Sequence, residues 1–344
     1  MDKVKKSKVT IRDVAREAGV SVATVSRYLN NTSYISTETE KKLKEVMHRL
    51  DYKPNEIARG LAKQKTNTIA LIIPDITNPF FPDLVIAIEQ VAKEKGYNII
   101  LVNTQEEELQ SNSFWRGFQN RYVDGFILAS FQFDQQALKD LEALQIPFVR
   151  IDRAAFTESS NSIGIDNYKG AIMAVEHLKE IGCRKIAHIS GPQSLLPSIE
   201  RMRGFEDHLR AVYSGLEPII YEGDFTLESG RTLTDQLIGE HKDVDGIFFA
   251  NDLMAVGAIK ALKALRIKVP DDVAIIGFDG IKLTEMIEPE ISTIVQPIYD
   301  IGVTATTKLI HLIENKVDET LNHELEVQLV KRESTLGFRR NSNE

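Results

Sequence analysis

The chain has 344 residues, more than one typical domain, and this length predicts two or three folded units. Hydrophobic residues make up 42% and charged residues 27%, a balance that excludes a wholly disordered chain. No stretch approaches the roughly 20 apolar residues of a membrane span, and the basic N-terminus lacks the apolar segment of a secretory signal. We therefore expect a cytoplasmic protein with no membrane partner. Cys183 is the only cysteine, which excludes an intrachain disulfide and a cysteine-based zinc cage.

Charge is distributed unevenly along the chain. Residues 1–66 hold ten Lys and five Arg against eight Asp and Glu, a net charge of +7, which leaves −15 for the rest of a chain whose net charge is −8. Such asymmetry predicts a basic module for a polyanion joined to an acidic body.

The basic module has the pattern of two short helices joined by a tight turn. Thr10 is a candidate cap for a first helix that Gly19 ends, and Ser21 is a candidate cap for a second helix, with Val25 and Leu29 on its inner face. A third helix is predicted from Ser36 to the residue before Lys53-Pro54. Residues 1–54 are therefore predicted to form an all-α helix-turn-helix domain, followed by a hinge helix and linker over residues 55–67.

The second helix of a helix-turn-helix enters the major groove of DNA. Opposite Val25, it offers Val22 and Ala23 for thymine methyl groups and Arg27 for guanine. Short hydroxyl donors suited to phosphate oxygens come from Thr10, Ser21, Thr24 and Ser26. The alternative is a solvated helical hairpin without a ligand, and the basic charge of this region favours DNA.

From Thr68 onward, short apolar runs alternate with amphipathic stretches of about 12–15 residues. This rhythm predicts parallel sheets with helices on both faces, and the number of runs favours two sheets over one. The predicted strands are residues 69–75, 98–104, 124–130, 147–152, 185–191, 218–224, 245–251 and 273–280.

Polar residues follow several of these runs, where ligands of open parallel sheets bind. Carboxylate and amide side chains form hydrogen bonds with sugar hydroxyl groups, and aromatic rings cover the apolar faces of a sugar. This combination of side chains therefore suits a small polyhydroxylated ligand. For each carboxylate the alternative is a helix cap. The sequence lacks GxGxxG after the first strand, GxxxxGK[ST], HExxH and GxSxG, so we expect no cofactor, no metal and no enzymatic activity.

VTIRDVAREAGVSVATVSRYLNN, followed by LDYKPNEIARGLA, resembles the headpiece of the lactose-repressor (LacI) family of bacterial transcription regulators. The resemblance implies that Val22, Ala23 and Arg27 read bases. It also implies that Asn55–Ala62 is a hinge helix that forms on the operator, with Leu61 wedged into the minor groove and Arg59 near phosphates. Two hinge helices at one site imply a homodimer and a pseudo-palindromic operator.

The body resembles the family's periplasmic-binding-protein-like core, a sugar-binding unit predicted over residues 68–340. Its N-lobe is predicted at about 68–167 and 298–322, and its C-lobe at about 168–297 and 323–340. The motifs TNPFF, IDR, RMRGF, GDF, FAND, GFDG and TIVQP look closest to ribose-binding members. The two Phe rings of TNPFF are expected to sandwich the sugar. The effector contacts that the resemblance implies are Asn78, Phe80, Phe81, Asp152, Arg153, Arg201, Phe225, Asn251, Asp279 and Gln296.

These features together predict a dimeric repressor of sugar-utilisation genes that a small sugar, ribose first, controls allosterically by releasing it from the operator. A sucrose- or fructose-responsive repressor is one alternative. A catabolite-control regulator whose effector is a phosphorylated carrier protein is another, less favoured one. A sugar-transport protein would need an export signal and no basic head, and an enzyme would need an acid/base pair that the sequence does not display. Helix 298–315 is predicted to return to the N-lobe and to lie at the dimer interface.

Overall fold

A computed structural model of the chain describes residues 9–30, 34–53, 65–104, 106–109, 111–118, 123–129, 135–151, 161–213, 215–315 and 322–338. The chain divides into two compact units between Thr66 and Asn67, here called the head and the core. No helix in the described ranges is long and apolar enough to cross a membrane. The predictions for Asn55, Arg59, Leu61, Asp152 and Arg153 lie outside the described residues.

The head contains three helices around a small apolar centre. They are α1 (Ile11–Ala18), α2 (Val22–Asn30) and α3 (Thr37–Arg49). Val14, Val25 and Leu43, one from each helix, are fully buried together. Gly19 ends α1 in the left-handed conformation, with φ 63°, which a residue without Cβ adopts at little cost. The predicted three helices and their tight turn are confirmed.

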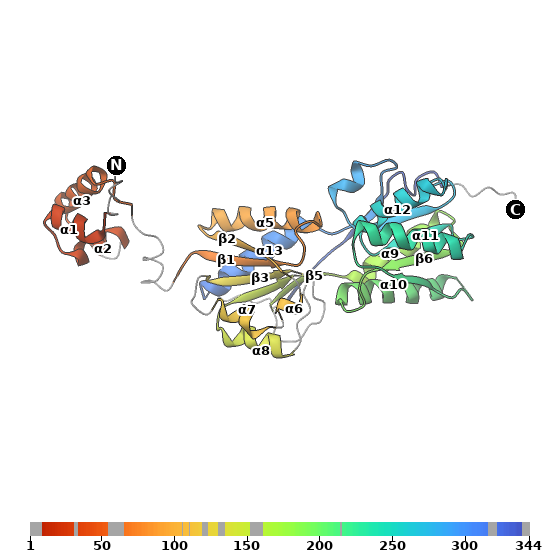
Figure 1. Cartoon of the computed structure of the whole chain (residues 1–344), viewed down its shortest axis with the longest axis horizontal. Coiled ribbons are helices and arrows are strands. Elements are labelled where there is room, and N and C mark those ends of the chain that lie inside the picture. Colours follow the sequence, from red (N-terminus) through yellow and green to blue (C-terminus); the bar gives the residue numbers. More distant parts are fainter. Residues whose placement is uncertain are drawn as a thin grey trace, which may run out of the picture. The chain divides into compact units, whose positions relative to one another are not determined.

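The core has two lobes, each built on a six-stranded sheet (Figure 1). The first sheet is entirely parallel in the order β11-β5-β4-β3-β1-β2. Its strands are β1 (Thr68–Ile73), β2 (Asn98–Asn103), β3 (Gly125–Ala129), β4 (Phe148–Ile151), β5 (Ser162–Ile165) and β11 (Asn322–Leu325). Its helices are α5 (Phe80–Glu94), α6 (Glu106–Leu109), α7 (Asn112–Arg116), α8 (Gln135–Ala143) and α13 (Ile298–Ile313).

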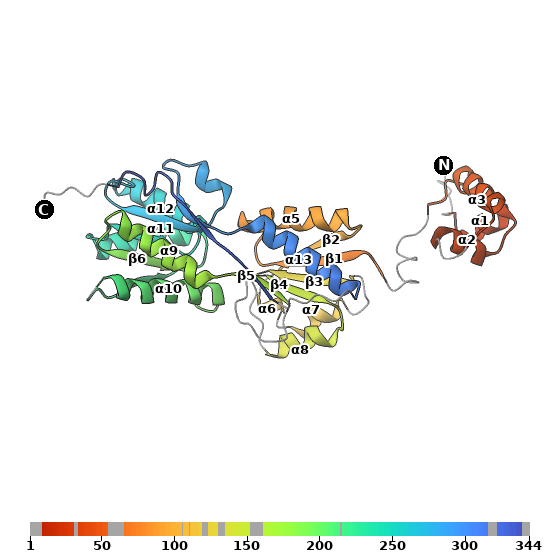
Figure 2. The ribbon, with the colours of Figure 1, turned by 180° about the vertical axis from the view of Figure 1, so that it is seen from behind.

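Alternation along β1 assigns helices to the two faces of this sheet. Ile69 and Leu71 belong to the buried cluster that α5 and α13 complete, whereas Ile72 packs with Trp115 of α7 and Leu141 of α8. Helices α5 and α13 lie side by side on one face, as Figure 2 shows. The sheet is therefore covered on both sides, which explains its nearly continuous apolar strands.

The second lobe repeats this plan in the order β12-β10-β9-β8-β6-β7, with β12 antiparallel to β10. Its strands are β6 (Ile186–Ser190), β7 (Ile219–Glu222), β8 (Gly246–Phe249), β9 (Ala274–Asp279), β10 (Ser292–Val295) and β12 (Gln328–Val330). Its helices are α9 (Asn167–Glu180), α10 (Leu196–Val212), α11 (Leu227–Glu240), α12 (Asp252–Ala264) and the short 3-10 helix η1 (Lys282–Glu285).

The chain passes between the lobes after β5, after β10 and after β11. The predicted return of helix 298–315 to the first lobe is confirmed by the packing of α13 on β3 and β4. The last passage falls after Leu325 rather than after residue 322, because β11 pairs with β5 through that residue. All eight predicted strands form; β5, β10, β11 and β12 are additional.

Candidate functional site

The caps of the head helices already use several of the predicted phosphate donors. Ser21 Oγ accepts a hydrogen bond from Thr24 N at 3.1 Å, and the two hydroxyl oxygens lie 2.9 Å apart. Thr10 Oγ1 donates to Asp13 Oδ2 at 2.7 Å. These side chains fix the starts of α1 and α2. The Thr10 hydroxyl gives its proton to Asp13, whereas the Ser21–Thr24 pair uses only one of its two protons and so retains one donor for a phosphate oxygen.

The outer face of α2 is exposed beside its buried inner residue. Val25 is fully buried, whereas Val22 is 42% exposed and Ala23 and Arg27 are also exposed. Ser26 is half-buried and accepts from Asn30 at 3.3 Å. Within the described head, no hydrogen bond or ion pair holds the Arg27 guanidinium, so all five of its N–H donors remain available to a base edge.

A cavity of about 790 Å³ lies in the core and is lined by residues of both lobes. Its size is in the range of small-molecule sites. The predicted effector residues that line it are Asn78, Phe80, Phe81, Arg201, Phe225, Asn251, Asp279 and Gln296. The structure thus brings together every predicted effector residue that it describes.

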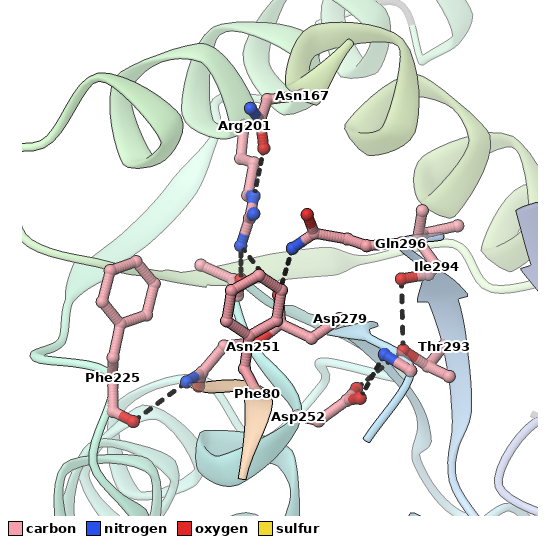
Figure 3. Close-up of polar contacts among 12 residues, drawn as sticks. Phe80, Asn167, Arg201, Phe225, Asn251, Asp252, Asp279, Thr293, Ile294 and Gln296 are labelled. Carbon is pink, nitrogen blue, oxygen red and sulfur yellow. Dashed lines mark hydrogen bonds and ion pairs between the residues drawn. The ribbon is translucent and has the colours of Figure 1, made fainter. Parts of the chain in front are cut away.

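Arg201, Asp279 and Gln296 form the polar wall of this cavity (Figure 3). Gln296 Nε2 donates to Asp279 Oδ1 at 2.7 Å, and Arg201 Nη1 lies 3.6 Å from the same oxygen. The guanidinium is held further by Asn167 Oδ1, 2.8 Å from its Nε, and by the Phe278 ring, 3.7 Å from its Cζ. Arg201 and Asp279 are 3% and 6% exposed, so their charges interact with little screening by solvent.

Asn251 joins two loops at the cavity. Its Oδ1 accepts from Met254 N at 3.0 Å and caps α12, and its Nδ2 donates to Phe225 O at 2.9 Å. The amide therefore retains one N–H and one lone pair for a ligand. Asn251 therefore caps α12 and lines the cavity at the same time.

The aromatic wall differs from the expected sandwich of two neighbouring rings. Phe80 and Phe81 open α5, and their ring centroids lie 5.2 Å apart at an interplanar angle of 88°. Rings arranged edge to face at that distance leave no space for a sugar between them. Phe225 lines the same cavity from the second lobe, so a sugar covered by rings on two sides would lie between Phe225 and the pair on α5.

Two cavity residues have backbone conformations that L-residues rarely adopt. Phe225 has φ 67° and Asp279 has φ 118°. Such conformations cost roughly 1–3 kcal/mol each and persist only where neighbouring contacts hold them. Their occurrence at two loops of one cavity indicates a site whose side-chain directions are fixed by the fold.

Asp252 stands behind the cavity wall. The sequence marks it, with Asn251, as a polar residue at a strand end, but it is not among the expected effector contacts. Its carboxylate is fully buried and accepts from Gly280 N, Ile281 N and Thr293 Oγ1 at 2.7, 2.9 and 2.7 Å. Burial, reinforced by the charge of Asp279, raises the pKa of Asp252 above its usual range, and these three bonds oppose the rise. The available signal was its position directly after Asn251, at a strand end.

The sequence prediction also missed the apolar part of the cavity. Besides the Phe rings it includes Pro192, Leu195, Pro197, Leu227, Leu253 and Pro74. The first three follow β6, so the rule that selects strand ends would have found them. Among the described side chains, no group of three or more His, Cys, Asp or Glu could hold a metal ion.

A DNA-binding helix-turn-helix joined to a two-lobed core with a central cavity defines a class of ligand-controlled bacterial regulators. Two family models match the chain: "Bacterial regulatory proteins, lacI family" over residues 10–55 and "Periplasmic binding protein-like domain" over residues 175–335. The ribose operon repressor of Halalkalibacterium halodurans is 40% identical over 97% of this chain and 99% of its own length. The chain belongs to the LacI family and is a DNA-binding transcriptional repressor.

Other members of the family are similar over comparable lengths. Catabolite control protein A of Priestia megaterium is 36% identical, over 95% of this chain and 99% of its own. The lac repressor dimer bound to operator and the anti-inducer ONPF is 29% identical with a TM-score of 0.86, over 96% of this chain and 100% of its own. A LacI family regulator from Enterococcus faecium with bound ribose is 29% identical with a TM-score of 0.70, over 79% and 100%. Besides catabolite control protein A, the other three of these four relatives are named as repressors or transcriptional regulators.

Proposed function

We propose that this repressor binds a pseudo-palindromic operator as a homodimer in the cytoplasm and that D-ribose, bound in the core cavity, releases it. The controlled genes then serve the use of that sugar. The similarity to a ribose operon repressor and to a ribose-bound regulator supports this choice of sugar.

One observation carries the proposal for a polyhydroxylated ligand. Gln296 is 4% exposed and lines the cavity, and its Oε1 has no hydrogen-bond partner in the described part of the chain. A buried acceptor without a partner costs roughly 1–3 kcal/mol. A ligand hydroxyl that donates to this oxygen removes the cost, so the cavity favours a molecule rich in hydroxyl groups.

The remaining walls suit the same ligand. Asp279 offers acceptor capacity and Arg201 directional donors, both held by protein contacts before a ligand arrives. The Phe80 and Phe225 rings offer apolar faces to the C–H side of a sugar ring. A furanose presents both kinds of surface, and this is the chemistry that we assign to the effector contacts.

On the DNA side, the exposed outer face of α2 supports base reading by Val22, Ala23 and Arg27. Thr10, Ser21, Thr24 and Ser26 are proposed to lie at phosphates, where hydroxyls used in caps act beside the helix N-termini. Asn55, Arg59 and Leu61 complete the proposed DNA contacts, and Asp152 and Arg153 the proposed effector contacts.

Two alternatives keep the repressor and change the effector. Fructose in its furanose form, alone or within sucrose, shares the ring and hydroxyl chemistry. A phosphorylated carrier protein is the second alternative, supported by the 36% identity to catabolite control protein A and the 26% identity to the transcription regulator CcpA of Lactococcus lactis. A protein effector gives no reason for the unsatisfied acceptor of Gln296 inside the cavity.

Isothermal titration of the purified protein with D-ribose, D-fructose and sucrose in parallel tests the proposal. We expect saturable binding of ribose at one site per chain. The variant Arg201→Lys should weaken it at least tenfold, because lysine cannot reach Asn167 and Asp279 together. Arg203→Lys, exposed on the same helix, is the matched control and should bind as the wild type. Binding heat with fructose or sucrose but not with ribose would identify that sugar as the effector instead. No binding heat with any of the three would favour a carrier protein as the effector.

A further inference from the structure

A carboxylate that does not reach the cavity is bonded beside two of the residues that line it, Asp279 and Gln296. Asp252 is the first residue of α12, directly after Asn251, and does not line the cavity. Its Oδ2 receives the backbone N–H groups of Gly280 and Ile281, and its Oδ1 receives the Thr293 hydroxyl. It therefore bonds the turn after β9 and a residue of β10 at once.

That turn carries Asp279 in a conformation that the residue does not prefer. Asp279 has φ 118° and Gly280 follows with φ 81°, so two consecutive residues lie outside the common regions. The N–H groups of the next two peptide units are the ones that Asp252 accepts. These bonds oppose relaxation of the turn, since strained backbone persists only where neighbouring contacts fix it.

The other oxygen of the Asp252 carboxylate, Oδ1, fixes a residue of β10 through its hydrogen bond with Thr293. Thr293 lies three residues before Gln296, and Gln296 N donates to Asp279 O at 3.0 Å while its side chain donates to Asp279 Oδ1. Asp279 and Gln296 are thus bonded to each other on the cavity side. On the side away from the cavity, Asp252 is bonded to the segments that carry both of them. Figure 3 shows Asp252 and Thr293 on one side of this pair and the cavity residues on the other.

The neighbouring strand leaves space for this carboxylate. A Cβ added to Gly277 of β9 would lie 2.2 Å from Asp252 Oδ1, a separation that real Cβ atoms do not show. A glycine at this position is therefore required for Asp252 to stand where it does. Gly277 is not among the cavity-lining residues, so it offers an independent way to displace the carboxylate.

We propose that Asp252 is a positioning residue for effector recognition, which sets the affinity for the sugar by holding Asp279 and Gln296 in their binding directions. The proposal rests on the proposed function for the identity of the ligand. Its geometric part, that Asp252 fixes residues 279–281, stands on this structure alone.

The test compares Asp252→Asn with Asp252→Ala in the full-length protein. Asparagine retains an oxygen for the two N–H groups and turns its amide to Thr293, whose hydroxyl can accept. Alanine leaves both N–H groups without a partner. We expect the ribose Kd to rise at least tenfold in Asp252→Ala and to stay within about threefold of the wild type in Asp252→Asn. Gly277→Ala should follow Asp252→Ala.

Asp245→Ala is the matched control for loss of stability. Asp245 is 9% exposed and accepts from Arg184 N and Lys185 N, but it precedes β8, at the end of the strand opposite Asn251. This variant should lower the melting temperature and leave the ribose Kd unchanged. If Asp252 served only the stability of the fold, Asp252→Ala would behave like Asp245→Ala. The titration would then show a smaller fraction of binding-competent protein, and the ribose Kd of that fraction would be unchanged.

Hydrogen exchange of residues 279–281 without ligand gives a second readout. We expect exchange there to accelerate at least tenfold in Asp252→Ala and to remain slow in Asp252→Asn. Unchanged exchange in Asp252→Ala, an unchanged Kd in that variant, or equal weakening by asparagine and alanine would each overturn the proposal. If the wild type does not bind ribose, the proposed function fails, while the exchange experiment still decides whether Asp252 holds the turn.

Discussion

Several side chains that line the cavity form hydrogen bonds with the protein in the absence of a ligand. Gln296 does so through only one of its two polar atoms. Its Nε2 is bonded to Asp279, and its Oε1 is buried without a partner in the described structure. We predict that Gln296→Met, of similar length, raises the ribose Kd about tenfold or more in isothermal titration. Gln236→Met on the exposed face of α11 should leave the Kd unchanged. Equal affinity of the two variants would contradict the assignment of Gln296.

Two buried histidines make the core sensitive to acid. Burial lowers the pKa of His177 to about 4 and that of His188 to about 3. In the unfolded chain both titrate near 6.5, so the unfolded state binds more protons below that pH and the free energy of unfolding falls as pH decreases from about 6.5 toward 4 and 3. At neutral pH and above, both are uncharged in either state and the penalty is absent.

His188 is suited to test this dependence. It stacks on Phe248 at 4.6 Å, and its Nε2 has no hydrogen-bond partner in the described structure. We predict that His188→Phe loses less unfolding free energy than the wild type between pH 7.5 and pH 5, measured by urea denaturation. An identical loss in both proteins would show that protonation of His188 does not contribute.

The position of polar residues at strand ends predicts Asn78, Asn251 and Asp279, whereas the other cavity residues are implied only by the resemblance to the LacI family: Phe80, Phe81, Arg201, Phe225 and Gln296. Asp252 and Asn167 act from behind, and their roles depend on contacts with residues 28 and 34 positions away. No local pattern encodes such pairs. The same limit explains the expected sandwich of Phe80 and Phe81, because adjacent positions in a sequence do not fix the angle between two rings.

At the scale of elements, the packing of α13 on α5 depends on one glycine. A Cβ added to Gly302 would lie 2.7 Å from Ala87 Cβ and 3.3 Å from Ile88 N. We predict that Gly302→Ala destabilises the core by about 1–3 kcal/mol, because the two helices must separate. Gly239→Ala near the end of α11 meets nothing within 4 Å and should stabilise by up to about 1 kcal/mol. Urea denaturation giving the same sign for both would contradict this packing.

Helix α2 should carry base recognition through a single exposed cation. We predict that Arg27→Ala weakens binding to an operator selected from a random DNA library by about 1–3 kcal/mol and relaxes its sequence preference, with ribose binding unchanged. Arg49→Ala on α3, which removes the same charge from an exposed ion pair with Glu17, should cost less and leave the preference intact. Mobility-shift titrations of both variants on the same DNA provide the comparison.

Periodicity predicted eight strands because each is an apolar run of usable length between helices. It does not predict β5, β10, β11 or β12, and length is not the reason, because the predicted strands β4, β7 and β8 also have four residues each. Strands β11 and β12 complete the two sheets by pairing with partners distant in sequence, as Asn322 of β11 does with Ser162 of β5. The antiparallel pairing of β12 with β10 has the same origin. A strand whose stability comes from pairing with a distant segment leaves little local signal.

For the whole molecule, the unequal charges of residues 1–66 and the remainder predict how its two binding activities respond to salt. Operator binding releases counterions from phosphates, so contacts to about six to ten phosphates would cost 10³–10⁵ in affinity between 50 and 200 mM salt. Binding of uncharged ribose in the core should change little over that range. Parallel titrations at both salt concentrations test this separation, and equal salt dependence would contradict it.

The central claim is that a sugar bound in the core cavity controls the affinity of the head for operator DNA. Fluorescence anisotropy with a labelled, library-selected operator tests it directly, with and without saturating D-ribose. We predict that ribose weakens operator binding about 5–150-fold, a coupling of roughly 1–3 kcal/mol, and that Gln296→Met needs correspondingly more ribose for the same effect. Operator affinity that ribose leaves unchanged, in a wild-type protein shown by titration to bind it, would contradict the account.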